Sequence, residues 1–305
     1  MRRALRAGGV TLLALSLAGF VGDRFWLTEL ATSVRVQLVL LGLVVAVAAL
    51  GLRARRVAVV AAAAVVVNLA VIVPFFFGAE PRPAGEARLR VAHVNMQHRA
   101  LDDDALAQAL RERRPDLFVL LDPPQGWVRT HPTFAGYRVL GDGSPKVSAA
   151  VLAREATPRV DRPFVEGLPG SALVVETVLG REPLWILALH AQAPMTPGLL
   201  AKRNRSLRTA ARLARARDGA RVVLGDLNSV PWSDAIERLE DTGGLVSSAR
   251  GNGIQATWPW LLGPAGIAID QLLHSPDLVV LDREPGPAFG STHRSLWVTL
   301  ARARP

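Results

Sequence analysis

The sequence predicts an α/β domain that follows an apolar, membrane-embedded N-terminal region. Half of the 305 residues are hydrophobic and the mean hydropathy is +0.24, although 20% of the residues are charged. Such a balance requires the apolar residues to be segregated, and they are concentrated in the first 78 positions. From residue 88 onward, short aliphatic runs alternate with amphipathic stretches, and polar residues recur where the runs end. This alternation is typical of an α/β domain with one functional rim.

Three apolar stretches, residues 8–27, 36–52 and 57–78, are the predicted membrane spans. Roughly 17 to 25 such residues cross a bilayer, so the first stretch is long enough only if it includes residues 25–27. One alternative is a bundle of buried helices in a soluble protein, but no amphipathic segment is left to cover it. A second alternative, for the first stretch, is a cleavable signal peptide, although no clear A-x-A site follows.

The arginines of this region predict its orientation. Two clusters lie on the same side of the first two spans: Arg2, Arg3 and Arg6, and Arg53, Arg55 and Arg56. The positive-inside rule places both clusters in the cytoplasm. We therefore expect a multi-pass plasma-membrane protein that has the lipid bilayer as a partner and the domain after residue 78 on the extracytoplasmic side.

The net charge of +10 is distributed unevenly. Residues 1–85 hold nine Lys and Arg against three Asp and Glu, and the other 220 residues hold 27 against 23. Most of the basic excess is therefore a topology signal, and a nucleic-acid partner is less favoured than the pI of 11.3 suggests. The absence of cysteine excludes disulfides and thiolate chemistry.

After a proline-rich hinge at residues 79–87, residues 88–305 form the predicted α/β domain. Helices are expected at residues 102–113 and 197–217, with another beginning near Asp234. The expected strands are residues 88–94, 116–121, 137–140, 146–153, 172–178, 184–190, 222–224, 267–273, 278–281 and 294–300.

The motif RVVLGDLNSVPW, residues 221–232, places polar groups at the end of a buried strand. Gly225 is expected to break the strand after Leu224. Asp226 and Asn228, two residues apart on an extended backbone, would then point the same way. The alternative is that both residues are simply turn formers.

The same pattern recurs along the domain, at Asn95, Asp122, His190, Asp270 and His293. Each residue alone could be a turn former, a satisfied core histidine or a structural acceptor. Together they favour one site, because strand ends in a sheet-based domain gather along one rim.

The ordered motifs resemble the endonuclease/exonuclease/phosphatase superfamily, the DNase I-like fold, over about residues 88–300. They are VNMQHRA, DLFVLLDPP, LALHAQAP, VVLGDLNSVPW, ATWPW, IAIDQLLHSP and GSTHRSLWVTL. ATWPW and LHAQAP resemble a membrane-anchored bacterial branch that includes glycopeptide-resistance proteins thought to act on undecaprenyl pyrophosphate. The resemblance implies a four-layer α/β sandwich, in which two mixed sheets pack face to face with helices outside.

The resemblance also implies a Mg²⁺ or Mn²⁺ site and assigns roles to the polar residues. Asn95 and Asp122 occupy metal-holding positions, and the catalytic positions are His190, Asp226, Asn228, Asp270 and His293. A hard cation prefers carboxylate oxygens, and a developing phosphorane is stabilised by hydrogen-bond donors.

Three positions depart from the family pattern. Asp122 replaces the metal-binding glutamate, and Gln271 replaces a frequent histidine or tyrosine. Thr292 replaces the aspartate that the family has before the last histidine. We expect that aspartate to orient the imidazole in the family and to favour its protonated form. The expectation is nevertheless a metal-dependent phosphoester or pyrophosphate hydrolase acting on a phosphorylated, lipid-linked substrate. The alternatives are an extracytoplasmic nuclease and a pseudoenzyme that binds phosphorylated ligands.

Overall fold

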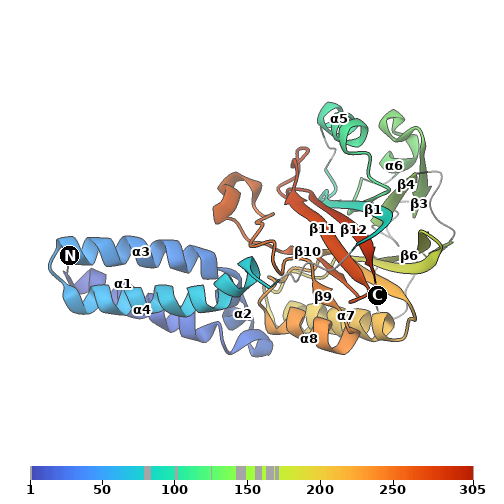
Figure 1. Ribbon diagram of the computed structural model, residues 1–305. Helices are drawn as coiled ribbons and strands as arrows, with labels where there is room; N and C mark the ends of the chain where they lie inside the picture. The colour runs from blue at the N-terminus through green and yellow to red at the C-terminus, as the bar shows by residue number, and fades with distance from the viewer. Residues whose placement is uncertain are drawn as a thin grey trace.

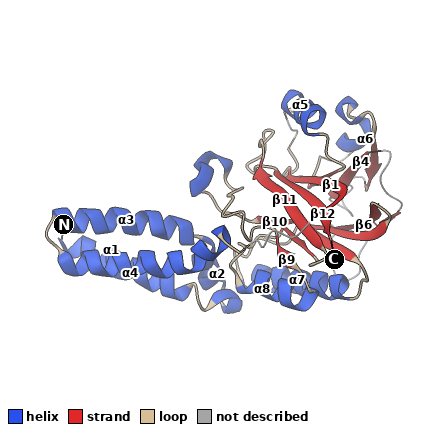
Figure 2. Cartoon of the chain, viewed as in Figure 1, coloured by secondary structure: helices blue, strands red, loops and turns tan. Residues whose placement is uncertain are grey.

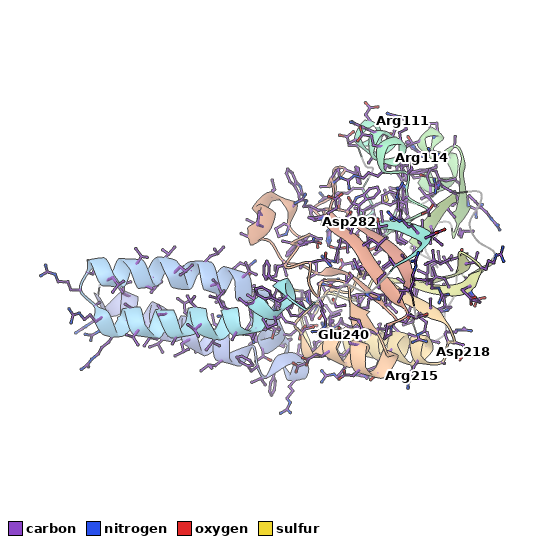
Figure 3. All side chains as sticks on the ribbon, viewed as in Figure 1. Arg111, Arg114, Arg215, Asp218, Glu240 and Asp282 are labelled. Carbon is purple, nitrogen blue, oxygen red and sulfur yellow. The ribbon has the colours of Figure 1, made fainter. Side chains whose placement is uncertain are left out.

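The computed structural model describes residues 2–78, 84–99, 102–124, 126–141, 149–154, 160–162, 168 and 172–304. The chain forms an elongated helical bundle followed by an α/β sandwich, and the two parts lie end to end (Figure 1). The charged side chains labelled in Figure 3 all come from the sandwich: Arg111, Arg114, Arg215, Asp218, Glu240 and Asp282.

Four helices make up the N-terminal part. They are α1 (Arg2–Ala18), α2 (Trp26–Ser33), α3 (Arg35–Gly51) and α4 (Arg55–Ile72), and the 3-10 helix η2 (Val73–Phe76) continues α4. Helices α1, α3 and α4 pack lengthwise against one another, whereas α2 lies at the end of the bundle that meets the sandwich (Figure 1).

One helix of this region, Arg55–Phe76, is long and apolar enough to cross a membrane. Helices α2 and α3 would count as a second span only as one segment bent by 67°. The predicted first span, residues 8–27, is wrong as a continuous helix. Its apolar helix ends at Ala18, and the chain then turns through the 3-10 helix η1 (Gly22–Arg24).

Three polar side chains inside the bundle bond to one another. Arg35 Nη1 donates to Asn68 Oδ1 at 3.0 Å and to Ser16 O at 3.3 Å, and Asn68 Nδ2 donates to Ser16 Oγ at 2.7 Å. All three residues are buried. Asn68, which interrupts an otherwise apolar stretch, is therefore held by partners on two neighbouring helices, as buried polar groups require.

The described residues of the sandwich form two six-stranded sheets, with the strand orders β11-β12-β1-β2-β4-β3 and β5-β6-β7-β8-β10-β9. Strand pairs β1/β2 and β7/β8 are parallel and the other pairs are antiparallel, so both sheets are mixed. The strands are β1 (Ala84–Asn95), β2 (Leu117–Leu121), β3 (Tyr137–Leu140), β4 (Ala149–Arg154), β5 (Val160–Arg162), β6 (Ala172–Leu179), β7 (Glu182–Leu189), β8 (Ala220–Asp226), β9 (Val246–Ser247), β10 (Asp270–His274), β11 (Leu278–Pro285) and β12 (Leu296–Ala303).

Helices cover the outer faces of both sheets (Figure 2). Helix α5 (Asp103–Arg113) packs on the first sheet, and α7 (Pro197–Arg215) and α8 (Asp234–Gly243) pack on the second. Shorter helical pieces are α6 (Trp127–Thr130), η3 (Pro132–Phe134) and η4 (Trp260–Ala265). One apolar core lies between the sheets and one lies beneath each helical layer. This arrangement confirms the predicted sandwich of two mixed sheets with helices outside.

The helix and strand predictions differ from the structure mainly at their ends. Strand β1 begins at Ala84 rather than at residue 88, and β10 begins at Asp270 rather than at residue 267. The proline-rich part of the hinge, residues 80–83, and the first residues of the predicted strand 146–153 lie outside the described residues. The short strands β5 and β9 were not predicted, because strands of three and two residues are too short to show an alternating pattern.

The bundle and the sandwich share a buried junction. Phe75 packs edge-on against Trp232 with ring centroids 5.9 Å apart, and Trp232 Nε1 donates to Thr32 O at 2.9 Å. Beside them, Arg203 Nη1 of α7 donates to Glu29 Oε1 of α2 at 2.7 Å and to Ser229 Oγ at 2.7 Å. The α2 helix is thus bonded directly to the loop that follows the GDLN motif.

Candidate active site

The polar residues singled out in the sequence meet at one end of the sandwich, between its two sheets. Asn95 and Asp226 are the last residues of β1 and β8, and Asp270 is the first residue of β10. Because β10 runs antiparallel to β8, Asp270 lies directly opposite Asp226. Three loop residues complete the group: Asp122 after β2, His190 after β7 and His293 before β12.

The GDLN segment has a different backbone from the one expected. Gly225 does not break β8, which continues to Asp226. Its φ of 135° and the position of a Cβ, which would lie 2.1 Å from Leu189 O, show that only glycine fits here. Asp226 and Asn228 are not on an extended chain either: Asn228 has φ 48°, and its N–H donates to Asp226 Oδ1 at 3.0 Å. This turn lets Asn228 Nδ2 donate to Ala191 O at 2.9 Å.

The carboxylate of Asp226 is the centre of the site. Its Oδ2 accepts a hydrogen bond from Asn95 Nδ2 at 2.9 Å and lies 3.4 Å from His190 Nε2 and 3.8 Å from His293 Nε2. Burial raises the pKa of Asp226, as does the charge of Asp270, while the two histidines and Asn95 oppose the rise. Asp226 is therefore a more basic carboxylate than an exposed aspartate.

His293 is held by Asp270. Its Nδ1 donates to Asp270 Oδ2 at 2.9 Å, and both side chains are buried. Burial alone would lower the pKa of His293, but the charge and hydrogen bond of Asp270 raise it above the ordinary histidine value. Conversely, burial would raise the pKa of Asp270, but His293 holds it below the ordinary value.

The role expected of the position before His293 is therefore wrong for this chain. Thr292 does not contact the imidazole: its Oγ1 donates to Gln97 Oε1 at 2.7 Å and accepts from Trp258 Nε1 at 3.2 Å. The carboxylate that orients His293 comes from Asp270, 23 residues away along the chain but adjacent in space. His293 therefore has an anionic partner, Asp270, although position 292 is a threonine.

Asp122 forms a second carboxylate–histidine pair. His190 Nδ1 donates to Asp122 Oδ2 at 2.6 Å. Burial by itself would lower the pKa of His190, but the hydrogen bond to Asp122 and the charge of Asp226 raise it to about 9. His190 is thus an imidazolium at neutral pH and presents positive charge next to Asp226.

His93 and Ser291 belong to the site but were not predicted from the sequence. His93 Nδ1 lies 3.7 Å from Asp270 Oδ1, and burial lowers the pKa of His93 to about 4, so it is neutral. Ser291 Oγ donates to Asn95 O at 2.5 Å and accepts from His293 N at 3.0 Å. For His93 the sequence did contain a signal. His93 and Asn95 are two residues apart on one strand, so their side chains share a face.

The donor set fits a hard divalent cation. Oxygens of Asp226 and Asp270 and a ring nitrogen of His293 lie within 4.8 Å of one another, and all three residues are buried. Asp270 Oδ1 is buried and has no hydrogen-bond partner among the described residues. The three carboxylates of Asp122, Asp226 and Asp270 outnumber the two histidines that face them, His190 and His293, and a divalent cation would balance the remaining negative charge. Asn95, predicted as a ligand, contacts this group through its amide, whereas Asp122 is engaged by His190.

Comparison with known proteins gives a family match and a fold match. The profile of the Endonuclease/Exonuclease/phosphatase family matches residues 92–293, which is most of the sandwich. The comparison with curated proteins gives no match.

Several solved structures share the fold. An endonuclease/exonuclease/phosphatase from Bacteroides vulgatus has 14% identity and a TM-score of 0.56 over 71% of this chain and 100% of that chain. The counterpart from Beutenbergia cavernae has 18% identity and a TM-score of 0.53 over 72% of each chain. TDP2 from D. rerio, complexed with a single-strand DNA product, has 13% identity and a TM-score of 0.55 over 70% of this chain and 99% of that chain.

Proposed function

Because the chain belongs to the endonuclease/exonuclease/phosphatase family, we propose that it is a divalent-metal-dependent hydrolase of phosphoester or pyrophosphate bonds. We propose further that it is anchored in the plasma membrane, with its catalytic domain on the extracytoplasmic side, and that its substrate is a lipid-linked phosphate. The observation that supports the chemistry is one buried group in which Asp226 is flanked by two histidines, each held by its own carboxylate.

The residues of this group have complementary roles in phosphoryl hydrolysis. Asp226, whose pKa is raised by burial, accepts the proton of the attacking water at its Oδ2. Asn95 Nδ2 keeps that oxygen in place. A bound divalent cation would supply positive charge to the phosphate oxygens, and Asp226 and Asp270 would hold it.

The two histidines act on the phosphate. The pKa of His190 is raised to about 9, and that of His293 is raised above the ordinary histidine value, so both environments favour the imidazolium form with its N–H donors. Donors aimed at the developing charge of a phosphorane stabilise the transition state more than the ground state. Asp122 and Asp270 fix the orientation of the rings and preserve their charge.

The membrane part of the proposal is supported by the helical bundle. Helix Arg55–Phe76 meets the length and hydropathy of a span. The arginines Arg53, Arg55 and Arg56 lie where α3 ends and α4 begins. In Figure 1 the connection between α3 and α4 is at the end of the bundle remote from the sandwich. By the positive-inside rule, that end is cytoplasmic and the sandwich is outside.

A reporter fused after Pro305 tests this orientation. Alkaline phosphatase should be active there and green fluorescent protein should be dark, because only an exported C-terminus lets the first enzyme fold and prevents the second from maturing. An inactive phosphatase together with a fluorescent protein would overturn the extracytoplasmic assignment.

A nuclease is the second candidate, because the D. rerio TDP2 structure contains a single-strand DNA product. The sandwich and hinge beyond residue 85 carry only four more basic than acidic residues, however. A nuclease without base specificity depends on phosphate contacts from a basic surface, so this charge favours a small phosphorylated group over a polynucleotide.

A panel of substrates tests the proposed function. Purified full-length protein with Mg²⁺ should release phosphate from an isoprenyl pyrophosphate faster than it cleaves bis-p-nitrophenyl phosphate, and it should leave plasmid DNA intact. Cleavage of the plasmid would favour the nuclease. Binding of the isoprenyl pyrophosphate without turnover would favour a pseudoenzyme.

A further inference from the structure

Within the part of the sandwich that the structure describes, exposed apolar side chains form one concentrated patch. Trp258, Trp260, Leu261 and Leu262 are 36%, 47%, 76% and 52% exposed and fall within five consecutive positions. Among the described residues beyond the bundle, the other exposed large hydrophobic side chains are scattered singly: Val178, Met195 and Leu281. We call residues 258–265, which include η4, the tryptophan lobe. A contiguous patch of this kind marks a contact surface rather than ordinary surface variation.

Hydrogen bonds at both ends hold the lobe in place. On the site side, Trp260 N donates to Thr292 O at 2.9 Å, and Trp258 Nε1 donates to Thr292 Oγ1 at 3.2 Å. On the bundle side, Gln37 Nε2 of α3 donates to Ala265 O at 2.6 Å and to Gly266 O at 3.0 Å. The lobe is therefore a fixed bridge between the active-site loop and the start of α3.

The hydrogen bonds from Gln37 place the lobe level with the first turn of α3. Gln37 is the third residue of α3, next to Val36, which packs in one cluster with Phe75 near the end of Arg55–Phe76. That 22-residue segment is about 33 Å long, close to the ~30 Å hydrocarbon core of a bilayer. A membrane crossed by this segment would have its surface on the sandwich side at the level of the lobe. In Figure 1 the lobe is the orange-red coil that projects from the sandwich toward the bundle.

The exposed apolar surface continues from the bundle at this level. Phe76 and Phe77, at the end of the long helix, are exposed, and Leu40 and Leu41 lie one turn beyond Gln37 on α3. Tryptophan side chains are favoured where hydrocarbon meets headgroups, because the indole is apolar over most of its surface and donates one hydrogen bond. The lobe thus carries the residue types of an interfacial anchor at the interfacial depth.

We propose that the tryptophan lobe inserts into the bilayer surface on the side of the sandwich and holds the active site at the headgroup layer. Trp258 links this contact to the chemistry, because its indole centroid is 6.3 Å from that of the His293 ring. The substrate class that fits is an amphiphile whose phosphate group lies in the headgroup layer while its apolar chain stays in the membrane. This inference rests on the proposed function for its substrate, but the insertion itself does not depend on activity.

The chain contains no cysteine, so single labels can be placed without removing a native thiol. Leu261→Cys in the full-length protein is labelled with an environment-sensitive fluorophore and reconstituted into phosphatidylcholine–phosphatidylglycerol vesicles containing spin-labelled lipid. The matched control is Val178→Cys, at a 48% exposed apolar position on β6, away from the bundle in Figure 1. We expect a blue-shifted, quenched label at position 261 and an unquenched label at position 178. Equal quenching at the two positions, or none at position 261, would overturn insertion.

A second measurement separates the substrate inference from the proposed function. The paired variant Leu261→Asp and Leu262→Asp should lower hydrolysis of vesicle-borne isoprenyl pyrophosphate relative to that of soluble bis-p-nitrophenyl phosphate by about tenfold or more, since two apolar contacts with lipid are lost. An unchanged ratio would contradict a role of the lobe in substrate choice. If the wild type hydrolyses neither compound while the label at position 261 is still quenched, the proposed function fails and the insertion stands.

Discussion

Replacing His293 with alanine is expected to lower metal-dependent phosphoester hydrolysis by about 10²- to 10⁴-fold, the usual contribution of one positioned acid–base or electrostatic group. His293 Nε2 faces Asp226 at 3.8 Å, and Asp270 holds the other nitrogen at 2.9 Å. The alanine variant removes the imidazole beside Asp226, which in the proposed mechanism donates to the phosphate. Initial rates with a soluble phosphodiester at saturating Mg²⁺ measure the loss.

Two further variants locate the source of this effect. Asp270→Asn should also cost activity, because it removes the carboxylate partner of His293 and one proposed ligand of the cation. Thr292→Asp should change the rate by less than about threefold, since Thr292 bonds to Gln97 and Trp258 and His293 already has a carboxylate partner. His98→Ala, at an exposed histidine, serves as the control. A large gain from Thr292→Asp together with an unaffected Asp270→Asn would show that the pairing described here is wrong.

Arg203→Met is expected to destabilise the protein by about 3 to 5 kcal/mol, because it leaves Glu29 buried without its cation. The two side chains are fully buried, and Arg203 Nη1 bonds to Glu29 Oε1 at 2.7 Å and to Ser229 Oγ at 2.7 Å. For a domain of this size the loss corresponds to a drop of about 10 °C in the unfolding temperature. Thermal unfolding of the full-length protein in detergent measures it.

The double variant Glu29→Met with Arg203→Met isolates the cause. Replacing a buried ion pair by apolar residues of similar volume is often close to neutral, so the double variant should recover most of the lost stability. Arg205→Ala, at an exposed arginine of the same helix, should shift the unfolding temperature by no more than about 2 °C. If the double variant is as unstable as Arg203→Met alone, packing rather than charge holds this junction.

Local patterns were sufficient to predict an α/β domain and the rim of the site, and the family resemblance supplied the arrangement in two packed sheets. The strands read as β-branched and aliphatic runs because they are buried on both faces, as the burial of Leu117–Leu121 illustrates. Helix α8 begins where Ser233 caps it, and the Ser233 Oγ accepts from Ile236 N at 3.3 Å. Asn95, His190, Asp226, Asp270 and His293 meet because strand ends share one edge of the sandwich.

Side-chain pairs formed by residues that are distant in the chain could not be predicted from the sequence. The partner of His293 is Asp270, on a neighbouring strand, although the adjacent position 292 was expected to matter most. Asp122 likewise meets His190, 68 positions along the chain. Hydrophobicity located the apolar stretches but not the turn after Ala18, because the turn depends on how α2 docks against the sandwich through Glu29.

The most direct test of the proposed hydrolytic centre is phosphate release by the purified full-length protein and by Asp226→Asn, each with Mg²⁺ and with EDTA. The variant keeps the size of the side chain but removes the carboxylate that both histidines and Asn95 face. We predict release by the wild type that stops with EDTA and returns with Mg²⁺, and release by the variant that is at least about 100-fold slower. Release by Asp226→Asn at the wild-type rate, or release by the wild type that is unaffected by EDTA, would contradict the assignment of this centre.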